Sequence, residues 1–245
     1  MSVIKSLSTA SRVLTQLRHD KRTLALVFIV PPILLTILKY VFDGNVRVFN
    51  QIAPMLLGIF PMIMMFLISS IATLRERSSG TLSRLMTMPI SKSDFIFGYA
   101  VAFSLIGFLQ AIVTSIVMLG FLGVSVSAGS ISTIIVAVLA SFLGTSLGLL
   151  TSAFAKTEFQ AVQFMPAFIF PQLLVCGLFV AREQMSELLR WFSNVMPLSY
   201  SVDAMKQVTF SSGWHFELSK DLLIVAGFAI VSLVLASMTI RRKEG

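Results

Sequence analysis

The amino-acid sequence predicts an all-α membrane protein with six transmembrane helices. Of its 245 residues, 56% are hydrophobic and only 12% are charged, which excludes an ordinary soluble domain. Six apolar stretches approach or exceed the length of about 20 residues that a helix needs to cross the hydrocarbon core. A helix satisfies its backbone hydrogen bonds internally, and these stretches lack the alternation of barrel strands. The predicted spans are residues 24–42, 52–74, 97–121, 131–154, 162–180 and 222–240.

Few residues bear on catalysis or metal binding. Cys176 is the only cysteine, and His19 lies far from His215, so we expect neither a disulfide framework nor a metal site. The sequence contains no G-x-x-x-x-G-K-[ST] loop and no H-E-x-x-H motif, which disfavours a nucleotide-binding site or a common metalloprotease site in this chain. A nucleic-acid-binding domain would need its basic residues on a soluble core. We therefore expect no catalytic residue, no bound cofactor or metal, and no nucleic-acid partner.

The basic residues predict the orientation. Thirteen of the 19 basic and five of the 11 acidic residues fall in the N-terminal segment, the loops after the second and fourth spans, and the C-terminal end. The other six basic residues are offset by six acidic ones. Because short loops rich in Lys and Arg stay in the cytoplasm, we expect both termini to be cytoplasmic in a plasma-membrane protein. The first apolar run is too long for a signal peptide, so we expect a retained helix.

The N-terminal segment, residues 1–23, predicts an amphipathic helix outside the membrane domain of residues 24–245. Its apolar residues recur at helical spacing and form one stripe: Val3, Leu7, Ala10, Leu14 and Leu17. We expect this helix to lie on the cytoplasmic membrane surface, in contact with lipids. A solvated basic leader is the alternative.

The loop after the second span predicts a short helix from Thr81 to Met88 that ends at Pro89. Ser91 and Asp94 have the spacing of a capping box at the start of the third span. A short helix between two spans could dock into a groove on a soluble protein, or it could be a turn at the membrane surface.

The spans themselves contain no Asp or Glu, which disfavours a proton- or sodium-coupled carrier. Gln172 is the best candidate for lining a substrate path, although an interhelical hydrogen bond is the simpler role. Small residues recur every fourth position of the fourth span and predict close packing within the chain. These residues are Ala140, Gly144, Gly148 and Ser152.

Two motifs resemble those of a known family. The pattern Glu76-Arg77-x-x-Gly80-Thr81-Leu82-x-x-Leu85-x-x-x-Pro89 resembles the coupling-helix signature of ABC-2 type transporter permeases. The end of the fifth span and the segment 181–220, which predicts short helices around Pro197, are similar to the outer region of this family. The matching outer residues include Gly177, Leu178, Phe179, Pro197, Leu198 and Tyr200. The nearest likeness is to daunorubicin-type drug exporters, from which Ser83, Ala181 and Ser186 depart.

The resemblance implies a permease that pairs with a second permease chain, identical or different, and with two cytosolic ATPase subunits that bind Mg-ATP. The coupling helix, residues 76–90, would sit in a cleft on the ATPase and make charged contacts to it through Glu76 and Arg77. Leu82 and Leu85, which lie near Thr81 in the motif, would pack in the cleft. Gly80 and Pro89 would set the bend of the helix. The N-terminal helix, with Leu7, Leu14 and Leu17, would be a second contact surface. The outer residues would form a gate.

The cargo is expected to be lipophilic or amphiphilic, a drug-like molecule or a lipid. Of the 26 aromatic residues 21 are Phe, and the chain has 13 Met, which suit adaptable apolar cavities. Two alternatives stay open at this point: a non-transporting partner or sensor of an ATPase complex, and an ATP-independent channel or carrier.

Overall fold

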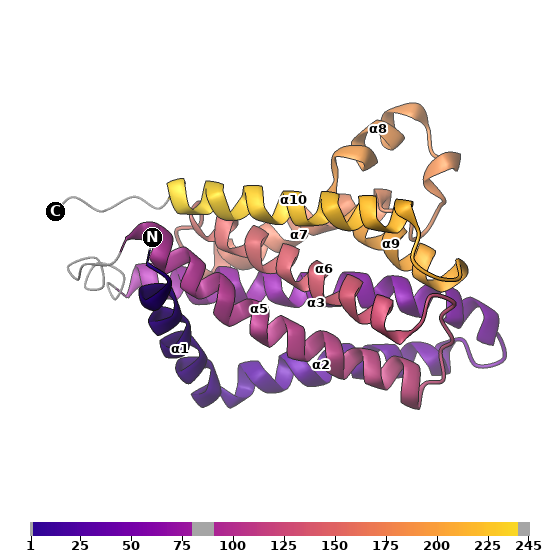
Figure 1. Cartoon of the computed structure of the whole chain (residues 1–245), viewed down its shortest axis with the longest axis horizontal. Helices are drawn as coiled ribbons and strands as arrows, with labels where there is room; N and C mark the ends of the chain where they lie inside the picture. Colours follow the sequence, from indigo (N-terminus) through magenta and orange to yellow (C-terminus); the bar gives the residue numbers. More distant parts are fainter. Residues whose placement is uncertain (1, 80–90, 240–245) are drawn as a thin grey trace.

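A computed structural model describes residues 2–79 and 91–239, and all regular structure within these ranges is helical (Figure 1). The predicted all-α class is therefore confirmed for this part of the chain. Five helices are long and apolar enough to cross a membrane, with mean hydropathies of 2.1 to 2.5. They are α2 (Lys21–Val41), α3 (Val46–Ser78), α5 (Lys92–Ile116) with a π-helical turn η1 (Val117–Phe121), α6 (Ser130–Ser152) and α10 (Phe216–Thr239).

The sixth expected span corresponds to α7 (Glu158–Val175), which is not among these five helices. α7 has 18 residues and contains Pro166 and Pro171, and three glutamines reduce its hydropathy. It begins earlier than the predicted 162–180, because Thr157 caps its start by accepting a hydrogen bond from the Gln160 amide (3.2 Å), and it also ends earlier, at Val175. The six-span count stays a prediction.

The helix α1 (Val3–His19) crosses one end of the bundle obliquely (Figure 1). Asp20 separates it from α2 and caps α2 by accepting hydrogen bonds from the Thr23 hydroxyl (2.6 Å) and the Thr23 amide (3.1 Å). These two bonds lower the pKa of the Asp20 carboxyl below its usual value, and the bond from the Thr23 hydroxyl has the larger effect.

The face of α1 that packs on the bundle differs from the predicted stripe. Ala10 and Leu17 of the stripe are buried in the protein, together with Val13 from outside the stripe, whereas Val3 and Leu7 are exposed and Leu14 is half-buried. The contact with α5 is close: a Cβ atom on Gly98 would lie 2.6 Å from the Thr9 Cβ. One edge of the stripe therefore packs against protein, and the other edge is free to meet lipid.

The start of α5 is fixed by the predicted capping box, which the structure confirms. The Ser91 hydroxyl accepts from the Asp94 amide, and the Asp94 carboxylate accepts from the Ser91 amide, each at 3.1 Å. The same carboxylate accepts from the Ser2 amide at 2.7 Å, so Asp94 also anchors the beginning of α1.

The centre of the bundle is the contact between α3 and α6. A Cβ atom on Gly144 would lie 2.1 Å from the Met62 carbonyl oxygen, and one on Gly148 would lie 2.3 Å from that of Phe66. Ser69 donates a hydrogen bond from α3 to the Thr145 carbonyl (3.2 Å). The prediction that the small residues of α6 serve packing within the chain is confirmed.

Substituting Gly144 with valine should destabilise the protein by about 2 kcal/mol, because the new side chain would push against backbone rather than against a flexible side chain. Thermal unfolding in detergent micelles measures the effect. Gly227→Val is the matched control, since nothing lies within 4 Å of a Cβ built there. Equal midpoints for the two variants would contradict close packing of α3 and α6.

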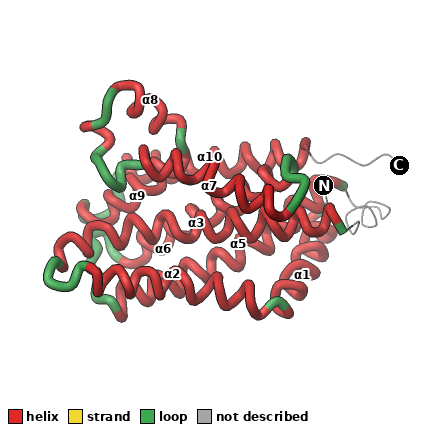
Figure 2. Tube along the Cα trace, turned by 180° about the vertical axis from the view of Figure 1, so that it is seen from behind, coloured by secondary structure: helices red, strands yellow, loops and turns green. Residues whose placement is uncertain are grey.

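The segment between α7 and α10 forms a 3₁₀ turn η2 (Arg182–Gln184), α8 (Glu187–Val195) and α9 (Pro197–Phe210). Short helices on both sides of the Pro197 break are therefore confirmed, with Pro197 at the first turn of α9. α9 packs between α3 and α10, and Ser201 donates to the Gly58 carbonyl (3.2 Å). α8 instead projects from the bundle (Figures 1 and 2).

Candidate functional site

The last turn of α3 bonds to three neighbouring helices at one end of the bundle. At this end, which we call the junction end, α1 starts, α3 and α6 end, α5 and α7 start, and α10 ends (Figure 1). Three consecutive side chains of α3 make the connections: Arg75, Glu76 and Arg77. The predicted coupling segment, 76–90, begins in this turn.

Glu76 is buried and faces α1. Its Oε1 atom accepts hydrogen bonds from Arg12 Nη1 (3.0 Å) and Gln16 Nε2 (3.2 Å), and Arg12 Nη2 donates to the Tyr99 hydroxyl (3.1 Å). The Glu76 and Arg12 side chains are only 11% and 29% exposed, so this ion pair is screened less than a surface pair. The pair joins α1, α3 and α5, and we call Arg12, Gln16, Glu76 and Tyr99 the junction cluster.

The Tyr99 ring packs between two other aromatic rings of α5. The ring centroid of Phe95 lies 4.4 Å from that of Tyr99, and the centroid of Phe103 lies at 6.0 Å. All three rings are buried, so the hydroxyl group that accepts the bond from Arg12 is held in a fixed position.

Arg75 and Arg77 point to other helices. Arg75 binds the Glu158 carboxylate with two hydrogen bonds of 3.0 Å, at the start of α7. Both side chains are at least half exposed, so this pair adds little stability. Arg77 donates to the carbonyl of Ser152, the last residue of α6, where a cation favours the negative end of the helix dipole.

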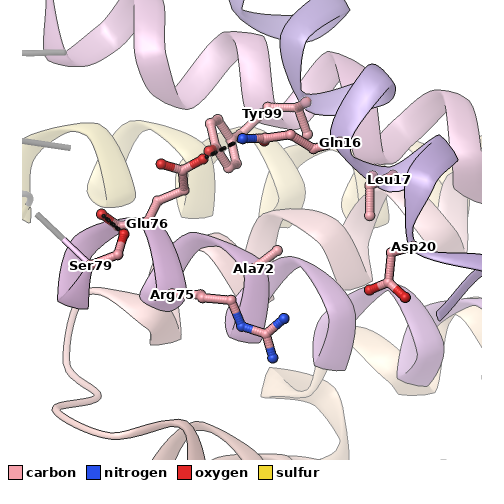
Figure 3. Close-up of a pocket in the computed structure, with 9 residues that line it drawn as sticks. Gln16, Leu17, Asp20, Ala72, Arg75, Glu76, Ser79 and Tyr99 are labelled. Atoms are coloured by element: carbon pink, nitrogen blue, oxygen red, sulfur yellow. Dashed lines mark hydrogen bonds between the residues drawn. The ribbon is translucent and has the colours of Figure 1, made fainter. Parts of the chain in front are cut away.

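A cleft with a volume of about 420 Å³ lies between α1 and α3 beside the junction cluster. Val13, Leu17 and Ala72 form its apolar walls. Figure 3 shows Gln16, Glu76 and Tyr99 facing one another in it, with Asp20 and Arg75 at other positions along the cleft. The cleft adjoins Ser79, the last residue of the coupling segment that the structure describes before residue 80.

The predicted ATPase contacts therefore have partners within the chain. Glu76 bonds to α1 and Arg77 bonds to α6, and whether either also contacts another protein stays a prediction. The other predicted coupling residues lie outside the described residues. They are Gly80, Thr81, Leu82, Leu85 and Pro89.

Gln172 joins α7 to α9. Its side-chain amide donates to the Phe168 carbonyl (2.9 Å), and its carbonyl oxygen accepts from the Leu198 amide (3.3 Å). Because both polar ends of this buried side chain are bonded, the geometry favours the interhelical role that was the alternative to a substrate path. The path itself stays a prediction.

The predicted outer-gate residues lie together at the opposite end of the bundle, which we call the far end. Gly177 has φ +87°, and a Cβ atom there would lie 2.6 Å from Lys206 Nζ. Leu198 is fully buried, Leu178 is half-buried and Phe179 is exposed. Tyr200 follows Pro197 on α9 and donates to the Asn194 carbonyl (2.7 Å).

Arg182 connects these pieces. Its guanidinium donates to the Asp203 carboxylate and to the Asn194 side chain, and it lies 5.4 Å from the centroid of the Tyr200 ring. Lys206 is 3.6 Å from the other oxygen of Asp203. The role of Arg182 could not be predicted from the sequence, because no local pattern pairs it with a carboxylate 21 residues away.

Comparison with known proteins gives a consistent result. A model of the ABC-2 type transporter family matches residues 6–210. "ABC transporter G family member 20" of Dictyostelium discoideum is 23% identical over 204 residues, which cover 82% of this chain and 28% of the relative. "Probable multidrug ABC transporter permease YbhR" of Escherichia coli (strain K12) is 27% identical over 161 residues, which cover 64% of this chain and 43% of the relative.

"Probable multidrug ABC transporter permease YbhS" of the same strain is 19% identical over 178 residues, covering 72% of this chain and 47% of the relative. The matches thus extend over less than half the length of each of these three relatives.

Proposed function

Because the chain belongs to the ABC-2 type transporter family, we propose that it is the permease subunit of an ATP-driven exporter, powered by separate ATPase subunits that bind Mg-ATP. The observation that supports this proposal most strongly is the junction cluster. It bonds the end of α3, from which the coupling segment leaves, to α1 and α5 at a buried ion pair. A force applied to the coupling segment is therefore shared by several helices.

We infer that the ATPase contacts the coupling segment, residues 76–90, and the exposed side of α1. Binding of ATP would move the end of α3, and α1 would follow because Glu76 holds Arg12 and Gln16. α3 is in backbone contact with α6 and also packs on α9. Such tightly packed helices shift between discrete arrangements rather than deform, as alternating access requires.

A second permease chain, identical or different, is proposed to cover α7 as the sixth span. Only four residues of α7 are buried within the chain. Its exposed stripe combines Val162, Phe170 and Leu174 with Gln163, which is also exposed. An exposed amide within a membrane helix favours contact with protein or a polar path over contact with lipid tails.

We place the junction end in the cytoplasm of a plasma-membrane protein. The described parts of the predicted cytoplasmic segments belong to this end, and the described loops with balanced charge belong to the far end. The cargo is proposed to be a lipophilic drug-like molecule or a lipid, in line with two relatives whose names describe them as probable multidrug permeases.

ATP-driven uptake into inside-out vesicles tests the proposal. The permease is co-expressed and purified with the ATPase that binds it, and accumulation of a fluorescent lipophilic dye is measured with and without ATP. We expect uptake that requires ATP and that Leu85→Ala reduces about tenfold, equivalent to ~1.4 kcal/mol. Uptake without ATP would support a channel, and stable ATPase binding without movement of any lipophilic cargo would support a non-transporting partner.

A further inference from the structure

The cleft between α1 and α3 has an apolar part and an acidic part. Val13, Leu17 and Ala72 line the apolar part, and Figure 3 shows Leu17 of α1 and Ala72 of α3 on its two sides. Asp20 and Glu76 supply carboxylates to the same cleft. Its volume of about 420 Å³ falls within the range of about 300–1,000 Å³ of small-molecule sites, whereas one water molecule occupies about 30 Å³. The cleft is therefore large enough for a small organic molecule.

The carboxylate of Glu76 has an unused oxygen. Oε1 accepts hydrogen bonds from Arg12 and Gln16, whereas Oε2 is buried and accepts none from any described residue. Glu76 as a whole is only 9% exposed, and a buried carboxylate oxygen without a donor is costly. The last torsion of a glutamate side chain has a broad minimum. A rotation about it can therefore turn the unused oxygen toward the cleft, where a ligand can donate to it.

The charges around the cleft favour a cationic donor. Asp20, Arg75 and Glu76 line the cleft, and their ion-pair partners among the described residues are Glu158 for Arg75 and Arg12 for Glu76. Three of these five side chains are acidic and two are basic, so one negative charge remains without a counterpart. A carboxylate accepts hydrogen bonds and cannot donate them, and its bond to a charged N–H group is stronger than its bond to a neutral donor. An ammonium group therefore suits the acidic part better than a hydroxyl group or an anion.

We propose that this cleft is a binding site for an amphiphilic amine, a molecule that joins an ammonium group to an apolar chain. The ammonium group donates to Glu76, and the apolar chain lies against Val13, Leu17 and Ala72. A soluble amine and the head group of phosphatidylethanolamine share this chemistry. The site is distinct from Gln172, which bonds to the start of α9. The inference needs neither ATP nor an ATPase, so its failure would leave the proposed transport standing.

Binding of the fluorescent amine dansylcadaverine to the purified permease alone, in maltoside micelles, tests the proposal. Its N-acetylated form has the same dye and chain but no charge, and we expect the amine to bind about ten times more tightly. Glu76→Gln should weaken binding of the amine about tenfold, because it removes the charge and keeps the shape. Glu217→Gln is the matched control at the far end and should leave binding unchanged.

A second variant tests the apolar part and keeps the Arg12–Glu76 pair, which guards against a folding defect of Glu76→Gln. Ala72→Phe places a large side chain in the cleft, so it should weaken binding of both the amine and the acetylated dye about tenfold. Thermal unfolding in the same micelles checks that each variant is folded.

Three results would overturn the proposal. Equal binding of the amine and the acetylated dye would mean that no carboxylate recognises the ammonium group. Binding that neither variant weakens would place the dye elsewhere in the permease, and absence of binding would mean that water suffices for Glu76.

Competition with lipids distinguishes the two sources of the amine. Displacement of the dye by phosphatidylethanolamine but not by phosphatidylcholine, whose head group has no N–H donor, would support a lipid ligand. Binding that neither lipid displaces would support a soluble amine.

Discussion

Replacing Glu76 with alanine is expected to uncouple ATP hydrolysis from transport. The change removes the acceptor of Arg12 and Gln16 and leaves the Arg12 guanidinium, 29% exposed, without its carboxylate. Breaking such a partly buried pair should destabilise the protein by ~1–3 kcal/mol. ATP hydrolysis by the complex should continue, while dye uptake per ATP hydrolysed falls about tenfold, because α1 no longer follows α3.

Glu217→Ala is the matched control for this prediction. Glu217 pairs with Lys220 (3.2 Å) at the far end, and both side chains are more than half exposed, so its loss should change stability by less than about 1 kcal/mol. The interpretation would be wrong if Glu76→Ala and Glu217→Ala had the same ratio of uptake to hydrolysis.

Replacing Arg182 with alanine should loosen the far end. The substitution removes the ion pair with Asp203, the hydrogen bond to Asn194 and the contact with the Tyr200 ring. Because the Arg182 side chain is only 12% exposed, the expected loss of stability is ~2–3 kcal/mol. Arg182→Lys should recover little, since a lysine lacks the planar fork that reaches two acceptors.

Hydrogen exchange in micelles measures this effect. In Arg182→Ala, exchange should increase in α8 and the first turns of α9 and stay unchanged in α3 and α6. Arg190→Ala is the control, because Arg190 is exposed and the hydrogen bonds it donates among the described residues go to the backbone carbonyls of Glu183 and Met185. Unaltered protection of α8 in Arg182→Ala would show that Arg182 does not hold the outer helices.

Features that depend on neighbouring residues could be predicted from the sequence. The capping box of Ser91 and Asp94 involves residues three positions apart, and its chemistry determines its geometry. The small residues of α6 repeat every fourth position, so they lie on one face of any helix, and a close helix contact follows. The family resemblance also rested on local motifs, and the match over residues 6–210 confirms it.

Features that depend on distant residues could not be predicted. Glu76 and Arg12 are 64 positions apart, and an exposed glutamate at the start of a loop has the same local pattern as a buried one. The side of α1 that packs on the bundle could not be predicted for a related reason, since the apolar stripe is wider than one contact and the packing on α5 buries Val13 rather than Val3. The length of α7 depends on the cap at Thr157 and on the left-handed turn at Gly177, and hydropathy detects neither of them.

The most direct test of the account exchanges the charges of the junction cluster. Arg12→Glu and Glu76→Arg each place like charges together and should each reduce ATP-driven dye uptake about tenfold, whereas the double variant restores opposite charges and should recover most of the uptake. Uptake is measured in the same inside-out vesicles, with the amount of bound ATPase matched. A double variant as impaired as either single variant, or single variants with normal uptake, would contradict the claim that the Arg12–Glu76 contact transmits the motion of the ATPase to the membrane helices.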